Sequence, residues 1–329
     1  MRKLLAICAL LAVTASAQIL TSHNVAAAPS GNGYRLSPVR TDLTIDKGSS
    51  DEVQVYIQNA SSAPEDLEVI VDDFEAPTNE SGYPALLLNG ATAPDHSLKQ
   101  FITIPDKELV LQPGQMSTVG VIITIPSNAV SGGYYGAIRF APISVGANGA
   151  KNVNLSASIA SLVLVTVPGN LHEELSISSL GVSQGASTKT HTIFFSNKNL
   201  SAQLRFDNTG NIQEQPIGNL ILKRGSKQLG TFVVNDVQDP GNVLPGSIRL
   251  FTVTLSKINW YGKYKLEGNF GYGSKGQLLS ASTTFYVIPV LFIILAILAI
   301  LLILFIIFGL PRLIRAYNRR VIARANRRR

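Results

Sequence analysis

The sequence predicts an all-β body of two tandem Ig-like β-sandwich domains, followed by a single C-terminal transmembrane α-helix. Three observations lead to this fold class. Short runs of alternating apolar and polar residues recur between Tyr34 and Tyr286. Similar turn motifs occur once in each half of that region, and residues 287–310 beyond it carry no charged side chain. Period-2 strands bounded by turn residues are typical of sandwiches, and an uncharged run of that length is typical of a membrane helix.

Residues 1–28 have the pattern of a secretory signal peptide. A short basic start, Met1-Arg2-Lys3, precedes an apolar run from Leu4 to about Val13 and the small residues Ala15-Ser16-Ala17. We expect cleavage between residues 17 and 28; a buried N-terminal helix is the alternative. Cys8 is the single cysteine of the chain. The exported part therefore has no cysteine for disulfides, zinc sites or thiol nucleophiles.

The apolar run 287–310 is long enough to span a bilayer, because 24 residues at about 1.5 Å rise cover a hydrocarbon core of about 30 Å. The tail 311–329 contains eight arginines and no acid. By the positive-inside tendency the tail is cytoplasmic and the body is extracellular, at a bacterial cell surface. Nucleic-acid binding is the alternative reading of these arginines; a membrane flank explains them without a second partner. The flank residues are Arg312, Arg315, Arg319 and Arg320.

The charge of the chain is unevenly distributed. The whole chain has a net charge of +7, of which the tail supplies +8 and Arg2 with Lys3 supply +2, so the body has a net charge of −3. The basic character of the whole chain therefore belongs to its two ends, and it says nothing about a basic body.

Two domains are expected at residues 29–169 and 170–286, with the boundary near Pro168-Gly169-Asn170. Each contains an Asn turn, then a Pro-Gly turn before a strand, then a Gly-Tyr strand start. Pro-Gly suits such turns because Pro presets φ and Gly tolerates a positive φ. The motifs are Asn59-Ala60-Ser61-Ser62, Leu111-Gln112-Pro113-Gly114-Gln115 and Gly133-Tyr134-Tyr135-Gly136 in the first domain, and Asp207-Asn208-Thr209-Gly210, Val243-Leu244-Pro245-Gly246-Ser247 and Gly262-Lys263-Tyr264-Lys265 in the second.

The first domain contains an insert at about residues 72–101. The Asn and Pro-Gly turns are 54 residues apart in the first domain and 37 in the second. A long polar insert on a rigid scaffold is a common place for a binding surface, which nominates Asn79, Gly82 and Tyr83. A solvated loop without a ligand is the alternative reading.

The aromatic pairs Tyr134-Tyr135 and Trp260-Tyr261 are further binding candidates, because aromatic rings anchor protein partners and stack on sugars. Burial in a sandwich core is the alternative. The acidic run Asp72-Asp73-Phe74-Glu75 has the oxygen ligands that Ca²⁺ prefers, and a solvated strand end is the favoured explanation. No catalytic or metal-binding motif occurs, so we predict neither enzyme activity nor a cofactor. The four histidines, His23, His96, His172 and His191, show no metal-ligand spacing.

The order of signal, two β domains, helix and basic tail resembles the WxL-interacting surface proteins of Gram-positive-type bacteria, whose domains are of the DUF916 and DUF3324 types. This resemblance implies that the first domain binds peptidoglycan and the second an exported WxL-domain protein. The residues that carry it are Tyr34-Arg35-Leu36-Ser37-Pro38, the Asn59 turn, residues 79–82, Leu111-Gln112-Pro113-Gly114, Ser131-Gly132-Gly133-Tyr134-Tyr135-Gly136, Val243-Leu244-Pro245-Gly246-Ser247 and Gly262-Lys263-Tyr264.

The leading functional hypothesis is a membrane-anchored extracellular adaptor for cell-wall polymer, exported surface proteins or both. The alternative is a structural stalk or a chaperone-like assembly factor for surface or pilus-like subunits, because sheet edges can accept an added strand. A signalling receptor is a weaker option, since the tail of about 19 residues is too short for a catalytic domain. A wall hydrolase ranks last.

Overall fold

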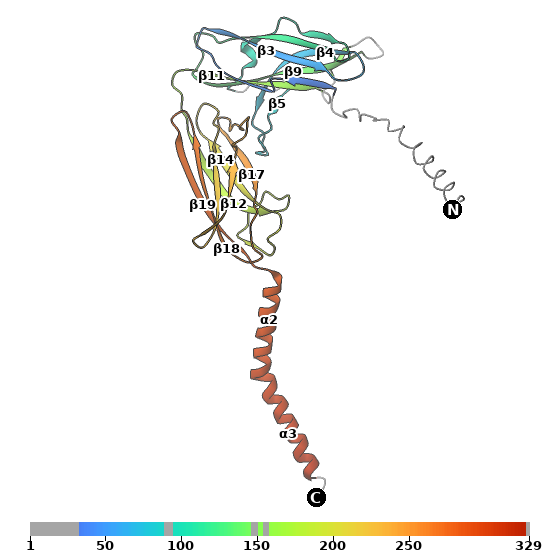
Figure 1. Ribbon diagram of the computed structural model, residues 1–329, viewed down its shortest axis with the longest axis vertical. Coiled ribbons are helices and arrows are strands. Elements are labelled where there is room, and N and C mark those ends of the chain that lie inside the picture. Colours follow the sequence, from blue (N-terminus) through green and yellow to red (C-terminus); the bar gives the residue numbers. More distant parts are fainter. Residues whose placement is uncertain (1–32, 89–94, 146–150, 154–157, 327–329) are drawn as a thin grey trace, which may run out of the picture.

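The computed structural model describes residues 33–88, 95–145, 151–153 and 158–326. The predicted signal peptide therefore lies outside the described residues. Two β-sandwiches follow one another, and a long C-terminal helix leaves the far end of the second (Figure 1). The predicted fold class, two Ig-like sandwiches and an apolar C-terminal helix, is confirmed.

The first sandwich packs a sheet in the order β1-β3-β8-β6 against a larger sheet in the order β2-β11-β9-β4-β5, with β7 pairing with β4 and β10 with β9. Alternation produces its core: Val53, Val55 and Ile57 of β3 point inward, while most of the residues between them are exposed. The strands are β1 Tyr34–Ser37, β2 Arg40–Thr44, β3 Ser50–Asn59, β4 Glu65–Glu75, β5 Ala85–Leu87, β6 Ile102–Thr103, β7 Glu108–Leu111, β8 Met116–Thr124, β9 Gly132–Val145, β10 Lys151–Val153 and β11 Ile159–Val167, with the 3₁₀ helix η1 at Lys99–Phe101.

The second sandwich packs a sheet in the order β12-β14-β17 against one in the order β13-β19-β18-β15-β16. Its core is rich in aromatic rings: Phe206 and Phe270 meet edge to face at 5.1 Å, and Tyr264 stacks on Phe285 at 5.3 Å. The strands are β12 Leu175–Gln184, β13 Ile193–Phe194, β14 Leu200–Asn208, β15 Ile217–Arg224, β16 Lys227–Val234, β17 Ser247–Thr254, β18 Gly262–Tyr272 and β19 Gln277–Val287.

The two sandwiches share one strand plan. In each sandwich, the two strands that come first in the chain belong to different sheets. In the first sandwich β1 pairs with β3, and β2 pairs in parallel with the last strand, β11. In the second, β12 pairs with β14, and β13 pairs in parallel with the last strand, β19. Of the remaining strands, β3, β4, β7, β8 and β9 correspond in order to β14, β15, β16, β17 and β18, whereas β5, β6 and β10 have no counterpart among the strands described for the second sandwich. The structure therefore contains the repeat that the turn motifs predicted.

The turn motifs of the two domains share the same hydrogen bonds, which are made by a buried asparagine in each domain. Asn59 donates from Nδ2 to the carbonyls of Ala63 and Leu111, at 2.8 and 3.0 Å. Asn208 donates in the same way to Ile212 and Val243, both at 2.8 Å. The Gly of each Pro-Gly turn, Gly114 or Gly246, donates its N–H to the carbonyl of that asparagine. The Asn side chain thus joins a strand end to the turn that starts a later strand.

The larger size of the first domain comes from residues 76–107, which lie between β4 and β7 where the second domain has a short hairpin turn. The predicted start of the insert at residue 72 was wrong, because Asp72 and Asp73 are buried in β4. Asp72 forms an ion pair with Arg139 at 2.5 Å. Asp73 accepts hydrogen bonds from the Ser97 hydroxyl and the Lys99 amide.

This arrangement contradicts both sequence-based readings of the acidic run. Asp72 and Asp73 have 0% and 4% of their surface exposed, so they do not form a solvated strand end. Their oxygens face a guanidinium, a hydroxyl and an amide rather than one another, and no acidic or histidine cluster suited to a metal occurs among the described residues. The sequence could not show this, because the partners come from distant segments.

The C-terminal helix comprises α2 Val290–Leu304, a π-helical turn η3 at Phe305–Gly309 and α3 Leu310–Asn326. It begins at Val290 rather than at residue 287, because Val287 ends β19 and is buried. It also continues past Pro311, which cannot donate an N–H and crowds the preceding turn. The π turn directly before it absorbs that defect. Its most apolar window has a mean hydropathy of 3.8.

A candidate binding site between the two domains

The insert connects the two sandwiches through Glu80. Its carboxylate accepts a hydrogen bond from Arg205 Nε of β14 at 2.6 Å, and its backbone carbonyl accepts one from the N–H of Leu250 in β17 at 2.9 Å. We call residues 76–84 the strap. In Figure 1 the chain next to β5 extends from the first sandwich toward β17. The insert, predicted as a binding surface, therefore contacts this chain's own second domain.

The strap needs glycine at position 82. Gly82 has a φ of +76°, and a Cβ there would lie 2.2 Å from Arg249 Nε. Asn79 shapes the turn before it, because its side-chain oxygen accepts the N–H of Ser81. The sequence signal at these residues therefore reflects turn geometry and close contact with Arg249.

A second set of contacts joins the domains near their connection. The Tyr135 hydroxyl donates to Gln213 Oε1 at 2.9 Å, and the N–H of Gly133 donates to the Asn211 carbonyl at 2.8 Å. Phe74, Tyr135, Ala137 and Leu164 form a small apolar cluster on the outer face of the larger sheet, and Leu244 of the second domain packs on it.

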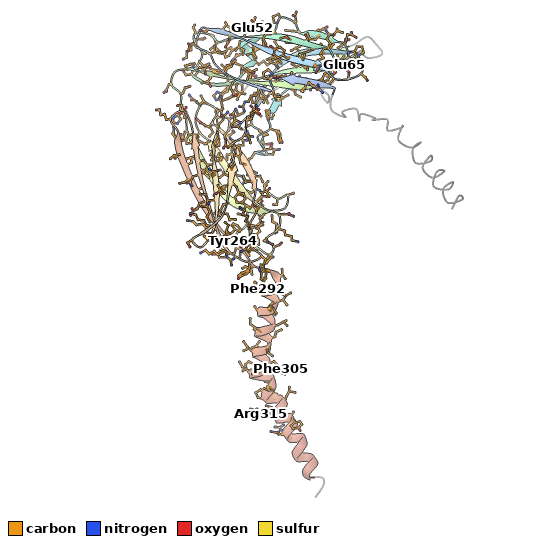
Figure 2. All side chains as sticks on the ribbon, viewed as in Figure 1. Glu52, Glu65, Tyr264, Phe292, Phe305 and Arg315 are labelled. Carbon is orange, nitrogen blue, oxygen red and sulfur yellow. The ribbon has the colours of Figure 1, made fainter. Side chains whose placement is uncertain are left out.

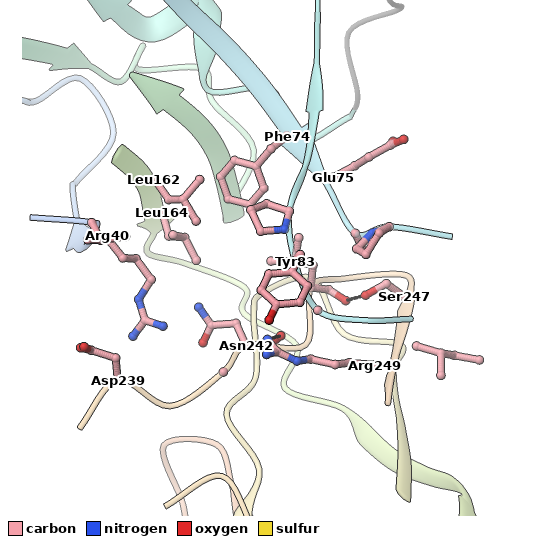
Figure 3. Close-up of a pocket in the computed structure, with 18 of the residues that line it drawn as sticks. Arg40, Phe74, Glu75, Tyr83, Leu162, Leu164, Asp239, Asn242, Ser247 and Arg249 are labelled. Atoms are coloured by element: carbon pink, nitrogen blue, oxygen red, sulfur yellow. Dashed lines mark hydrogen bonds between the residues drawn. The ribbon is translucent and has the colours of Figure 1, made fainter. Parts of the chain in front are cut away.

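Between the strap and these contacts lies a cavity of about 590 Å³. We call it the inter-domain cavity. Phe74, Leu162 and Leu164 of the first domain and Leu244 of the second line its apolar part, and Arg40, Tyr83, Asn242 and Arg249 line its polar part (Figure 3). A site of this size, mostly apolar with a few polar groups, is typical of small-ligand pockets.

Two guanidinium groups, of Arg40 and Arg249, line the cavity together with two carboxyl groups, of Glu75 and Asp239. Arg40 pairs with Asp42 at 2.8 Å and donates to the Pro240 carbonyl at 2.8 Å. Arg249 donates to the Asn242 carbonyl at 2.7 Å and has no acid within ion-pair distance among the described residues. Burial, together with the charge of Arg40, lowers the pKa of Arg249. A cation that is destabilised by burial and by a like charge favours an anionic ligand.

Two buried polar atoms at this cavity have no hydrogen-bond partner in the described structure: Arg249 Nε, a donor, and Asn242 Oδ1, an acceptor. Unpaired buried polar groups are costly. Both atoms are enclosed by the protein itself, so a ligand in the cavity would contact other atoms of the Arg249 and Asn242 side chains, together with the leucine and phenylalanine side chains.

The structure separates the predicted site residues. Gly82 and Tyr83 line the inter-domain cavity, with Tyr83 80% exposed at its edge, and Asn79 lies on the same strap. Tyr134 is in the core, its hydroxyl donating to the Val130 carbonyl, so it offers no surface to a ligand. Tyr135 is buried at the domain contact, its ring tilted against Phe74.

Trp260 and Tyr261 lie at the opposite end of the second sandwich. Trp260 stacks on Phe292 of the helix, with ring centroids 5.0 Å apart, and Tyr261 meets the same ring edge-on at 5.6 Å. Figure 2 shows Phe292 just beyond this end and Arg315 further along the helix. Arg312, Arg315 and Arg319 are exposed on the helix. Arg320 also lies in α3, but its side chain is not among those that the structure describes.

Sequence reasoning missed Arg40, Asn242, Arg249 and the apolar residues of the cavity. One signal was present. Arg249 interrupts the apolar run Ile248–Phe251, where a half-buried strand would place a side chain of intermediate exposure. No local pattern in the sequence indicates that Arg249 lines the same cavity as Arg40, because Arg40 belongs to the other domain.

The fold and site thus define a two-sandwich binding protein carried on an apolar helix. Residues 41–142 match the family described as "WxL Interacting Protein, peptidoglycan binding domain". The first domain therefore matches this family over most of its length, and the resemblance inferred from sequence is confirmed for that domain. A comparison with curated proteins finds no match.

Many solved structures share the β-sandwich arrangement at low similarity. They include the class 5 fimbriae chaperone CfaA (TM-score 0.36, 13% identity, covering 78% of this chain and 99% of that one). The CsuC-CsuE chaperone–tip adhesion subunit pre-assembly complex from Csu pili of Acinetobacter baumannii gives a TM-score of 0.36 at 12% identity, covering 75% and 97%. The E. coli chaperone DraB gives 0.32 at 14%, covering 78% and 96%. Nothing about function follows from likeness at this level.

Proposed function

We propose that this protein is a membrane-anchored surface adaptor that holds cell-wall polymer outside the cell. The observation that carries the proposal is a peptidoglycan-binding-family domain built into a two-sandwich body. A helix long and apolar enough to span a bilayer follows this body directly. In this proposal α2 and η3 cross the membrane, and the arginine-rich α3 lies on the cytoplasmic side.

The inter-domain cavity is the proposed wall-binding site. Cell-wall peptides end in carboxylates and carry small apolar side chains and amide N–H groups. Arg40 and Arg249 would bind the carboxylate, the Asn242 side chain would contact the peptide amides, and Leu162, Leu164 and Leu244 would contact the apolar part. Charge-assisted hydrogen bonds of this kind are among the stronger polar contacts in proteins.

The test is retention of the detergent-solubilised full chain on purified cell-wall sacculi. Arg249→Gln and Arg40→Gln are each expected to weaken retention about tenfold, the equivalent of about 1.4 kcal/mol. Arg35→Gln, an exposed arginine in the neighbouring strand β1, is the matched control and should bind normally.

Two results would separate the parts of the proposal. Wild-type retention no higher than that of an unrelated sandwich protein would remove wall binding. Normal retention of both cavity variants would keep wall binding and place it elsewhere on the first domain.

An exported protein partner is the second candidate. Strand β16 has a hydrogen-bonded neighbour on one side in the described sheet, and Val233 on it is 55% exposed. Such an edge can pair with a strand of another chain. Crosslinking in intact cells from a photoreactive residue at position 233 should capture an exported protein if this second role operates, and wall glycan alone would argue against it.

A further inference from the structure

The helix leaves the second sandwich through a group of aromatic and basic side chains. The loop at 195–199 adjoins the loop at 255–261, because Asn197 Nδ2 donates to the Ile258 carbonyl at 2.7 Å. The Arg224 guanidinium lies over the Tyr261 ring at 4.9 Å, which brings the β15–β16 turn to the same end. We call this group the basal platform: Phe195, Lys198, Arg224, Lys227, Lys257, Trp260, Tyr261 and Lys263.

The platform is held firmly against the helix. Only Ile288 and Pro289 separate β19 from α2, and the N–H of Ile288 donates to the Phe194 carbonyl at 2.8 Å. The first turn of the helix carries Phe292, which packs on both Trp260 and Tyr261. The position of the helix in a membrane therefore sets the position of the platform.

The length of the apolar helix places the platform at the membrane surface. The uncharged residues 290–310 rise about 31 Å at about 1.5 Å each, which matches a hydrocarbon core of about 30 Å. Val290 then lies at the outer boundary. The Trp260 and Tyr261 rings lie at headgroup level, where amphipathic aromatic residues are enriched in membrane proteins.

The charges of the platform suit anionic headgroups. Lys198, Arg224, Lys227, Lys257 and Lys263 lie at this end, whereas the segments 193–200, 224–227 and 255–263 contain no acid. The exported body as a whole is negatively charged, so this end is a local exception. Phe195 and Trp260 are 56% and 52% exposed, which leaves apolar surface for the interfacial layer.

We propose that the basal platform binds the outer leaflet of the membrane, with anionic phosphate headgroups as its ligand. The proposal rests on the membrane-spanning role of the helix. Stacking on sugar is less well supported, because Phe292 already covers a face of the Trp260 ring and Arg224 lies over Tyr261. Platform binding would hold the second sandwich upright and keep the inter-domain cavity away from the bilayer.

Trp260 is the only tryptophan in the chain, so its fluorescence reports on the platform alone. The full chain is reconstituted into nanodiscs of phosphatidylglycerol or phosphatidylcholine whose acyl chains carry bromine near the headgroup. We expect loss of most Trp260 emission in phosphatidylglycerol discs, with little quenching by aqueous iodide. Deep bromines near the chain ends should quench less.

Two variants serve as controls. A Trp260→Phe chain with Met116→Trp carries its tryptophan on an exposed position of β8, and should be quenched by iodide only. Lys257→Gln with Lys263→Gln should reduce lipid quenching in phosphatidylglycerol discs to the phosphatidylcholine level. Lys47→Gln with Lys107→Gln, exposed lysines of the first domain, should have no effect.

Co-flotation of the chain with lipid measures the anchor independently. A floating chain whose Trp260 is open to iodide and unquenched by bromine would overturn the platform proposal and leave the anchor intact. Bromine quenching that is independent of lipid charge and of both lysines would overturn the anionic ligand. A chain that does not float would remove the anchor itself.

Discussion

Glu214 has a carboxyl group that is almost fully buried, although no catalytic role for an acid is proposed in this protein. It is 3% exposed, it lies in an isolated bridge with Val243, and its Oε1 has no hydrogen-bond partner in the described structure. Burial, and then the nearby charge of Glu173, raise its pKa to about 7. The protonated form is therefore favoured in the folded state.

This shift predicts a pH dependence of stability. The folded pKa of about 7 lies above the ordinary 4.5, so the contribution of Glu214 is fully present below about pH 4.5 and is lost as pH rises through 7. Glu214→Gln should raise the free energy of unfolding at pH 8 by about 1–2 kcal/mol, and by much less at pH 4.5. Urea unfolding at both pH values measures this. Glu52→Gln, on an exposed residue, is the control; equal gains at both pH values would contradict the assignment.

At the scale of elements, the buried asparagines show how one strand plan is specified twice. Asn59 and Asn208 have no exposed surface, and each ties the end of one strand to two backbone carbonyls of other segments. The Pro-Gly turn then returns an N–H to the same residue. The turn residues that are recognisable in the sequence therefore take part in a tertiary contact between two sheets.

Replacing this side chain should be costly. Asn208→Ala leaves the carbonyls of Ile212 and Val243 without their side-chain donor, and we expect a loss of about 2–3 kcal/mol in the free energy of unfolding. Chemical denaturation followed by tryptophan fluorescence measures it. Asn219→Ala, on an exposed face of β15, should stay within about 0.5 kcal/mol. Equal effects of the two changes would show that the hydrogen bonds are dispensable.

At the scale of the whole molecule, the strap makes one body of two repeats. The inter-domain cavity exists only while the domains are docked, since Arg40 belongs to the first and Arg249 to the second. The helix continues the second sandwich almost without a linker, so the docking also sets how the first domain stands relative to the helix.

Two glycines with the same φ allow the docking to be tested. Gly82 and Gly114 both have a φ of +76°, but a Cβ at Gly82 would meet Arg249, whereas one at Gly114 would meet nothing within 4 Å. Both alanine variants should lose about 1 kcal/mol through backbone strain. Only Gly82→Ala should also expose the amide of Leu250, which donates to Glu80, to faster hydrogen exchange. Equal exchange in the two variants would mean that the strap does not hold the domains.

The sequence alone determined the β class, the repeat, the apolar helix and the family of the first domain. Each depends on a local pattern: alternation, turn residues, or an uninterrupted apolar run. Only the tertiary structure decided that Asp72 pairs with Arg139, that Tyr134 is core, and that Trp260 contacts the helix. It also placed Arg40 next to Pro240, 200 residues away in the chain. The physical reason is that a pocket between domains is made by packing, and no periodicity along the chain records which distant side chains face the same space.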